Sequence, residues 1–426
     1  MIEAARWPAV PPPGADAHEL GQVKAKVATF TEHGHYPCHH SLVAALTDAA
    51  ARRPEATSLD LVAVPAARVA SNLRHAAFVA ASTGAHLLVL CSRSAAADAA
   101  FRVATRQLPA ERVTTVRVPP GWCLPGLNLV ADSSPLTRSR DVDTHLKRNV
   151  ALAVMRQVGW SRIMFLDDDV RGFGPAEAAV VGSVLSPEVC GGPQAVGWIM
   201  DDFPDNSMVC HAYRRAGGDQ RSFIGGGALA LVLDEDTPHF PRSYNEDWLF
   251  MLPYLLRGPS SLVLGGSLKQ RSFDPFGSPR DAILQEAGDV LGEGLFRLVH
   301  CNLRVTEATS QTFWRQVLAD RCALIVAVKN RLVAKGGEDV PAIIDALDAA
   351  LTMDHKARDW PVLLARWVSD WLCDMIRWRH WAGRLGSADS LREGLRQLGL
   401  RPYVPEPGHG PDRIVPGIVP LAPSRA

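Results

Sequence analysis

A short apolar run that ends in three aspartates constrains this chain more than any other feature. It reads Ile163-Met164-Phe165-Leu166-Asp167-Asp168-Asp169. A buried strand cannot carry adjacent carboxylates inside a core, so the acids should lie where the strand emerges at its carboxyl end. Open α/β sheets bind ligands at that edge. Adjacent carboxylates attract Mg²⁺ or Mn²⁺, which also bind substrate phosphates. The alternative is a helix N-cap or a solvated turn.

The segments before this triplet alternate between expected strands and expected helices. The strands are expected at residues 59–64, 86–91 and 113–118, and the helices at 41–53, 70–82, 95–107 and 141–158. This alternation predicts a parallel sheet with crossover helices. The aspartate triplet then ends the fourth strand.

The pattern changes after about residue 177. Further strands are expected at residues 195–200, 228–233 and 262–264, and a helix at 246–256. Beyond Pro279 the chain is expected to be almost purely helical to about Gly394. The predicted organisation is an N-terminal extension (1–57), an α/β domain (58–276), a helical domain (277–396) and a Pro-rich tail (397–426).

Composition excludes several classes of function. Lysine plus arginine number 45, as do aspartate plus glutamate, so no global basic field favours nucleic acid. The eight cysteines include no CxxC pair, which predicts reduced thiols in a cytoplasmic protein rather than disulfides or a zinc site. We find no signal peptide and no apolar segment long enough for a transmembrane span.

A second motif reads Tyr244-Asn245-Glu246-Asp247-Trp248. Its acidic pair opens an expected helix, where the helix dipole favours negative charge, so a plain cap is one interpretation. The functional interpretation is a carboxylate that acts as general base on an acceptor hydroxyl. Upstream, Gly225, Gly226 and Gly227 precede an expected apolar strand. They allow backbone to approach a ligand closely, or they form a turn.

A third motif, Lys147-Arg148-Asn149, lies in the helix before the triplet. Lys147 could reach phosphate, as could Arg140 upstream. Asn149 could contact a nucleobase or the sheet edge. For Arg148 the alternative interpretation is a solvated helix charge.

Together these segments resemble a GT-A (Rossmann-like) glycosyltransferase, closest in pattern to glycosyltransferase family 2 and its relatives. The resemblance covers residues 59–276 and rests on three features in order. The first is a strand followed by Val64-Pro65-Ala66-Ala67-Arg68, where the family grips its nucleotide. The second is Lys-Arg-Asn, then Phe-Leu-Asp-Asp-Asp, which resembles the family's DxD motif. The third is Gly-Gly-Gly, an apolar strand and Asn-Glu-Asp-Trp, which resembles its acceptor wall and ED motif.

The resemblance implies metal-dependent transfer of a sugar from a nucleotide-diphosphate sugar to an acceptor hydroxyl, with inversion. It implies donor binding by Pro65, Arg68, Arg140, Lys147, Asn149, Asp167 and Asp168. It implies acceptor binding by Gly225, Gly226, Gly227 and Trp248. It implies that Asp167, Asp169 and Asp274 hold Mn²⁺ or Mg²⁺. Asp247 matches the base of inverting members, with Glu246 beside it.

The chain departs from the family pattern in two places. It has no QxxRW motif, and the stretch after the ED helix, residues 269–276, has no histidine ligand. Asp274 is expected to substitute there, or Lys269 or Arg271 to neutralise the diphosphate, and inverting versus retaining transfer stays open. The rival functions are a sugar nucleotidyltransferase and a non-catalytic sugar-nucleotide-binding protein.

The expected helical domain carries its own patterns. Five tryptophans recur at helical spacing, at positions 360, 367, 371, 378 and 381. They predict a packed core or a homodimer face, with acceptor stacking as the alternative. An acidic set, Glu286, Asp289 and Glu293 beside Gln285, is interpreted as a solvated face rather than a metal site. Four histidines around Cys38, at positions 33, 35, 39 and 40, are interpreted as loop residues rather than zinc ligands.

Overall fold

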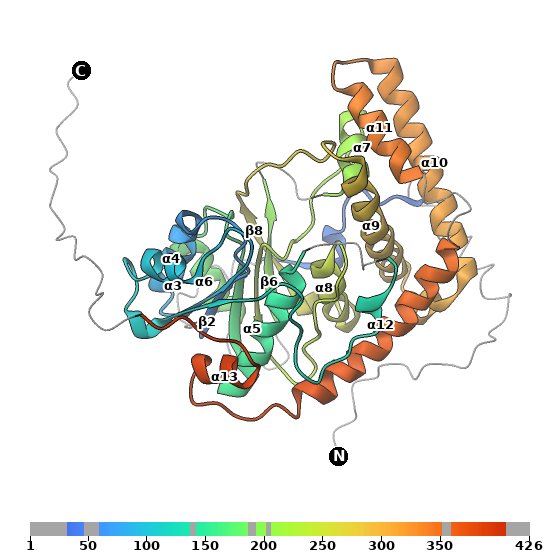
Figure 1. Ribbon diagram of the computed structural model, residues 1–426. Coiled ribbons are helices and arrows are strands. Elements are labelled where there is room, and N and C mark those ends of the chain that lie inside the picture. Colours follow the sequence, from blue (N-terminus) through green and yellow to red (C-terminus); the bar gives the residue numbers. More distant parts are fainter. Residues whose placement is uncertain are drawn as a thin grey trace, which may run out of the picture.

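An eight-stranded sheet forms the centre of the molecule (Figure 1). The structure is a computed structural model that describes residues 32–46, 59–136, 142–185, 193–201, 206–351 and 359–405. The strands lie in the order β1-β8-β6-β7-β5-β2-β3-β4. Their bounds are β1 Ala44–Ala45, β2 Leu61–Val64, β3 His86–Cys91, β4 Val113–Arg117, β5 Arg162–Leu166, β6 Ala195–Met200, β7 Ala228–Val232 and β8 Leu262–Leu268.

The sheet is mixed. The four strands of the alternating first part, β2 to β5, pair in parallel as expected, and antiparallel pairs enter with the strands after residue 177. β7 runs antiparallel to both β5 and β6, whereas the other neighbours pair in parallel. The register pairs Leu166 with Ala228, and the N–H of Asp167 donates to the carbonyl of Gly227 at 2.9 Å. The end of β5 therefore lies directly beside the start of β7. The aspartate triplet and the glycine run consequently meet at one edge.

Helices cover both faces of the sheet. Alternate residues of β2 point to opposite faces, because Leu61 and Ala63 belong to one apolar cluster and Val62 and Val64 to another. On the Val62 face lie α3 (Arg74–Ser82), α4 (Ala97–Ala104) and α6 (Pro175–Val184). The opposite face packs against α5 (Thr144–Val158), α8 (Glu246–Arg257) and α13 (Leu391–Gln397). A sheet covered on both faces explains why its strands are apolar runs.

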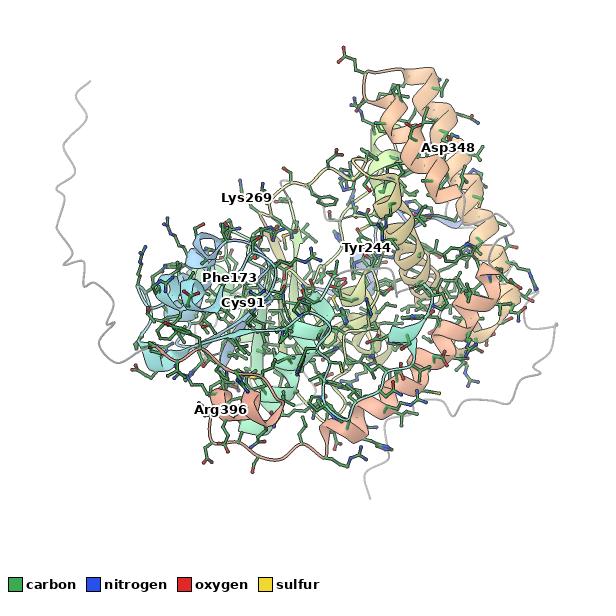
Figure 2. The ribbon with its side chains drawn as sticks, in the orientation of Figure 1. Cys91, Phe173, Tyr244, Lys269, Asp348 and Arg396 are labelled. Atoms are coloured by element: carbon green, nitrogen blue, oxygen red, sulfur yellow. The ribbon has the colours of Figure 1, made fainter. Side chains whose placement is uncertain are left out.

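The C-terminal region is helical, as expected. It contains α9 (Pro279–His300), α10 (Gln311–Lys335), α11 (Val340–Leu351) and α12 (Trp360–Ala382). α10 and α11 form a projecting arm, whereas α12 runs along the body of the molecule (Figure 1). Figure 2 marks Cys91 at the end of β3 within the α/β part and Asp348 on α11 in the arm. The α/β fold with a helical C-terminal region is therefore confirmed.

The tryptophans of α12 form part of the core of this chain. Trp367, Trp371 and Trp378 are each 1% exposed. The indole N–H of Trp378 donates to the carbonyl of Thr237 at 3.0 Å, and that of Trp381 to the carbonyl of Pro125 at 2.9 Å. The core interpretation is thus right, and these rings offer neither a dimer face nor an acceptor platform.

Some secondary-structure predictions are wrong or missing where contacts between distant parts of the chain determine the structure. The helix expected at 41–53 is wrong over its described part, because Ala44 and Ala45 form β1 and pair with Val263 and Leu264 of β8. Residues 47–53 lie outside the described residues. The sequence also missed α6 and α7 (Met208–Arg215). Short 3-10 helices occupy Glu32–Gly34, His40–Leu42, Ala70–Leu73, Ala110–Arg112, Ala131–Ser133, Pro259–Ser261 and Val305–Thr309.

Two further observations bear on the expectations from composition. Among the described residues, no helix combines the length and the apolar character needed to cross a bilayer. The described cysteines are free thiols, at positions 38, 91, 123, 210, 301, 322 and 373.

Candidate functional site

Asp168 holds the loop after β2 against the aspartate triplet. Its side chain is 1% exposed and accepts the backbone N–H groups of Ala67 and Arg68, each at 3.0 Å. The Arg68 guanidinium donates to it as well. The nearby Pro65 is buried. The middle residue of the triplet therefore fixes the loop in which the sequence predicts nucleotide binding.

Asp169 contacts the ends of two long side chains, Arg68 and Gln270. Its Oδ2 pairs with Nη2 of Arg68 at 2.9 Å, and its Oδ1 accepts from Nε2 of Gln270 at 3.3 Å. Burial raises the pKa of Asp169, and the Arg68 cation opposes that shift. The Arg68 side chain is 43% exposed, so it can exchange its partner for an incoming ligand. The sequence analysis missed Gln270, whose only signal is its position just after β8.

Asp167 is linked to a buried arginine. Its Oδ1 accepts from Nη2 of Arg148 at 3.0 Å. Burial raises the pKa of Asp167 to about 6; Arg148 opposes the shift, whereas Asp169 and Asp168 add to it. The Arg148 side chain is only 3% exposed, so the alternative of a solvated helix charge is wrong. A buried guanidinium persists because carboxylates surround it.

The same arginine reaches the acidic pair of the second motif. Nη1 of Arg148 donates to Oε1 of Glu246 at 3.3 Å, and its guanidinium carbon lies 5.3 Å from the Phe240 ring centroid. Asp247 accepts the backbone N–H of Gly226 at 2.5 Å and that of Trp248 at 2.9 Å. Burial raises the pKa of Asp247, as does the adjacent Glu246. A carboxylate whose pKa moves toward neutrality suits general base catalysis.

The glycine run lies between these two acidic groups. A Cβ at Gly226 would lie 2.4 Å from Nη1 of Arg148 and 2.8 Å from Cβ of Asp247. A Cβ at Gly227 would lie 3.4 Å from Oδ2 of Asp167. The glycines therefore allow backbone to approach the functional side chains closely.

Lys147 and Asn149 make their contacts within the protein. Lys147 is fully buried and donates to the carbonyl of Ala66 at 2.8 Å and to Oγ of Ser92 at 2.6 Å, and it pairs with Asp143 at 3.0 Å. Asn149 exchanges two hydrogen bonds with the backbone of Phe240, each at 2.8 Å. Lys147 thus joins the loops after β2 and β3 to α5, and Asn149 anchors the segment before α8.

Two other predicted residues, Trp248 and Asp274, lie apart from this convergence. Trp248 is buried against the rings of His39, Phe223 and Phe296, with centroids between 4.9 and 5.6 Å away. Asp274 is exposed and accepts the N–H of Phe276 at 2.9 Å within its own loop. Arg140 lies outside the described residues.

A cleft of about 530 Å³ opens beside the Lys147 contacts. It is lined by the segments that follow β3 and β4 and by the start of α5. Its lining includes Ser92 and Asp143, both Lys147 partners, and four basic side chains, Arg93, Arg117, His145 and Arg242. The cleft therefore lies at the carboxyl ends of parallel strands and favours an anionic ligand. Sequence reasoning did not identify it, because its walls come from separate loops.

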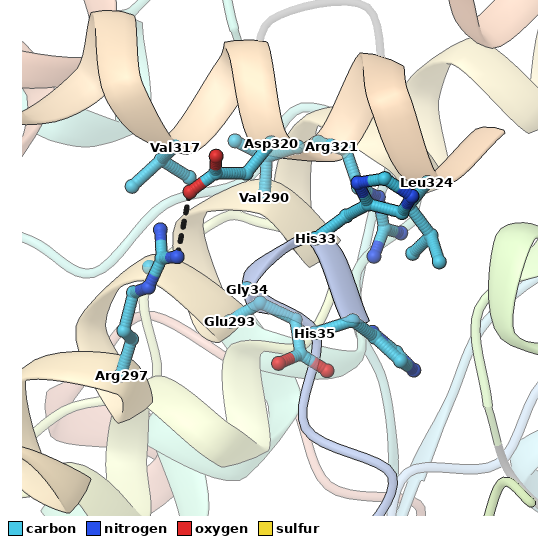
Figure 3. Close-up of a pocket in the computed structure, with 11 residues that line it drawn as sticks. His33, Gly34, His35, Val290, Glu293, Arg297, Val317, Asp320, Arg321 and Leu324 are labelled. Carbon is cyan, nitrogen blue, oxygen red and sulfur yellow. Dashed lines mark hydrogen bonds and ion pairs between the residues drawn. The ribbon is translucent and has the colours of Figure 1, made fainter. Parts of the chain in front are cut away.

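The acidic face of α9 is buried, which corrects its interpretation as solvated. Glu286 is 1% and Asp289 2% exposed, and both bind Arg321 of α10. Glu293 pairs with Nε2 of His39 at 3.4 Å. Figure 3 shows Glu293 near a small pocket of about 20 Å³, where Arg297 and Asp320 form an ion pair at 2.6 Å.

Comparisons with known proteins return structures but no sequence family. No family profile and no curated protein matches the chain. A structure of glucosyl-3-phosphoglycerate synthase from Mycobacterium tuberculosis with Mn²⁺, UDP and glucosyl-3-phosphoglycerate is similar at 16% identity, with a TM-score of 0.35. The match covers 63% of this chain and 87% of that one. Mannosyl-3-phosphoglycerate synthase from Rubrobacter xylanophilus is similar at 16% identity and a TM-score of 0.35, covering 59% and 78%.

Proposed function

We propose that the protein is a metal-dependent glycosyltransferase that moves a sugar from a nucleotide-diphosphate sugar to an acceptor hydroxyl. The observation that carries this proposal is the position of Arg148, which donates to Asp167 at 3.0 Å and to Glu246 at 3.3 Å. Arg148 thus links Asp167, a proposed metal ligand, to Glu246, the neighbour of the proposed base Asp247, which supports one site for both groups. Sugar transfer requires both groups within one site, because donor and acceptor react there together.

The residues present fit a hard divalent cation. Asp167 and Asp169 would hold Mn²⁺ or Mg²⁺ through carboxylate oxygens, and Gln270 adds an amide oxygen beside Asp169 once its side chain turns. The partners of Asp169 are the ends of long side chains, which can move to admit an ion. Asp274 contacts its own loop and is the less suitable ligand. When bound, the metal supplies positive charge to the departing diphosphate.

We propose that the donor nucleotide binds in the cleft beside Lys147. Its basic lining at Arg93, Arg117 and Arg242 suits phosphate, and the cleft volume of about 530 Å³ lies in the usual range for small-molecule sites. Arg68 stands at the triplet with its side chain 43% exposed and can bind the diphosphate. Lys147 and Asp168 support this site by fixing its loops. The free thiols support a reducing compartment, the cytoplasm.

Asp247 is proposed as the general base. The acceptor oxygen attacks the anomeric carbon, the bond from that carbon to the diphosphate oxygen breaks, and the acceptor proton passes to a carboxylate oxygen of Asp247. Attack from the face opposite the leaving group inverts the anomeric centre. The N–H groups of Gly226 and Trp248 hold the carboxylate in one orientation for this step.

A two-stage experiment tests this function. UDP, GDP and dTDP sugars are screened by thermal shift with and without Mn²⁺, because a ligand that binds only the folded state raises the melting temperature. Donors that bind are then incubated with hydroxyl acceptors, and the anomer formed is identified by NMR. Release of nucleoside diphosphate with an inverted product supports the proposal. In a parallel incubation with a nucleoside triphosphate and a sugar 1-phosphate, release of pyrophosphate identifies a nucleotidyltransferase. Binding without turnover in either incubation identifies a binding protein.

A further inference from the structure

The residue before the acidic pair has an unusual conformation. Asn245, the N-cap of α8, lies in the left-handed region at φ 58° and ψ 36°. N-cap residues normally adopt extended dihedrals, and their side-chain oxygens accept an N–H of the first turn. Asn245 makes no such capping bond. The start of α8 alone therefore explains neither its backbone nor its side-chain direction.

The Asn245 side chain instead contacts the helical region. Its Nδ2 donates to Oδ1 of Asp289 on α9 at 3.1 Å. The other oxygen of Asp289 accepts from the Arg321 guanidinium, which also binds Glu286 at 2.6 and 2.9 Å. All three charged residues are buried. A continuous polar chain thus runs from α10 through α9 to the residue that precedes Glu246.

Helix α9 also touches this turn through two glycines. A Cβ at Gly288 would lie 2.4 Å from the carbonyl oxygen of Tyr244. A Cβ at Gly292 would lie 3.3 Å from the Trp248 ring and 3.5 Å from Nδ2 of Asn245. The helix backbone therefore lies against the turn on both sides of Glu246 and Asp247.

A metal ion is the rival explanation for the buried acids. Donor atoms of Cys210, Asp289 and Glu293 all lie within 4.8 Å of one another. Arg321 already brings a full positive charge to Asp289. A metal cation at the same carboxylate would be repelled by that guanidinium at short distance. Glu293 pairs with His39. The guanidinium therefore supplies the charge that these acids require.

We propose that Asn245, Asp289 and Arg321 are positioning residues that orient Asp247, an inference that rests on the proposed glycosyl transfer. They hold the left-handed turn that starts α8, and this turn directs Asp247 toward the N–H of Gly226. The helical region thereby sets the geometry of the base while contacting neither sugar nor nucleotide. Strain held by surrounding structure at such a turn is a common device of functional sites.

The test compares three asparagine variants. Asn245→Ala removes both the contact with Asp289 and the tolerance for positive φ, whereas Asn245→Gly removes the contact alone. Asn302→Ala is the matched control, because Asn302 has φ 53° and is exposed just beyond α9. We expect kcat to fall at least about tenfold in Asn245→Ala and less in Asn245→Gly, with donor Kd within about twofold of wild type. Asn302→Ala should keep its wild-type kcat.

A second readout does not depend on turnover. Hydrogen exchange of a peptide spanning 224–228 reports the N–H of Gly226, which Asp247 accepts in the wild type. Faster exchange in Asn245→Ala and in Asp289→Asn supports the inference. If the wild type transfers no sugar, that result refutes only the proposed function, and the exchange measurement still tests the inference. Wild-type exchange and wild-type kcat in both Asn245 variants would overturn the inference. If Asn245→Ala does not fold, Asn245→Gly decides by the same two measurements.

Discussion

The guanidinium of Arg148 donates to the carboxylate of Asp167 at 3.0 Å inside the protein, with the arginine side chain only 3% exposed. The same cation donates to Glu246. The carboxylates raise the pKa of Arg148 although burial opposes its charge. One buried cation therefore compensates acids from two motifs that lie about eighty residues apart in the sequence.

Replacing this cation should destabilise the protein in a pH-dependent way. Arg148→Met removes the buried cation that compensates Asp167 and Glu246, and we expect the free energy of unfolding to fall by about 3–5 kcal/mol near pH 7. The loss should be smaller near pH 5, because carboxylates that have lost this cation become protonated there. Urea denaturation at both pH values measures it. Arg102→Met, which breaks an exposed pair with Asp98, is the control and should cost at most about 1 kcal/mol. Equal losses at both pH values for Arg148→Met would contradict this account.

Asp169 should be required for metal-dependent donor binding. Asp169→Ala should abolish transfer and remove the Mn²⁺-dependent part of the thermal stabilisation by nucleotide, while the metal-free melting temperature changes little. The physical reason is that its partners, Arg68 and Gln270, are long side chains that can rearrange. Asp98→Ala is the control, because Asp98 is an exposed acid on α4, distant in sequence from Asp169. This variant should behave as wild type. Full activity of Asp169→Ala in EDTA would exclude the metal site.

Asp247→Asn should reduce kcat by about two to four orders of magnitude, the usual contribution of a general base. Donor affinity should be unchanged. Each carboxylate oxygen of Asp247 accepts one backbone N–H group. In the asparagine variant, the side-chain NH₂ group replaces one of these oxygens and faces an N–H donor, so we expect a stability loss of about 1–3 kcal/mol. Kinetics and urea denaturation measure the two effects separately. If Glu246→Gln is inactive instead, the base is Glu246; if both variants turn over normally, a retaining mechanism replaces the inverting one.

Metal affinity should depend on the protonation of Asp167. Its pKa in the metal-free protein is raised from 3.8 to about 6, so folding favours the protonated form and the stability of the metal-free protein falls as pH rises through that range. Mn²⁺ binds the deprotonated form. Its apparent Kd should therefore rise up to about tenfold for each pH unit below about 6. Calorimetric titration with Mn²⁺ at several pH values measures this, and Asp167→Asn should lose the dependence. A pH-independent Kd in the wild type would argue against Asp167 as a ligand.

His239 should make the fold sensitive to acid. It is fully buried, burial lowers its pKa from 6.5 to about 3, and neither ring nitrogen has a hydrogen-bond partner among the described residues. The unfolded chain binds a proton at His239 that the folded chain does not bind. The contribution of His239 to stability is therefore lost as pH falls below about 6.5. The slope is up to about 1.4 kcal/mol per pH unit. His239→Phe should flatten stability against pH between about 4 and 6.5 relative to wild type. An unchanged slope would show that His239 is protonated in the fold.

Local sequence patterns determined most of the secondary structure. The apolar runs at His86–Cys91 and Ala195–Met200 are strands with the expected bounds. The acidic pair begins α8, and the tryptophan spacing identifies the buried face of α12. Each of these follows from periodicity or from an end signal within a few residues, so one sequence suffices to predict them.

The tertiary structure decided which charges are buried and what they bind. Arg148 and the acids of α9 carry the sequence signature of solvated helix faces, yet both are buried because partners distant in sequence neutralise them. The antiparallel course of β7 brings Gly227 beside Asp167, and no local pattern specifies that pairing. Asn245 precedes the first turn of α8, yet its side chain binds Asp289 of α9 and not that turn. The free energy of a buried charge depends on its neighbours in space, and only the folded chain defines those neighbours.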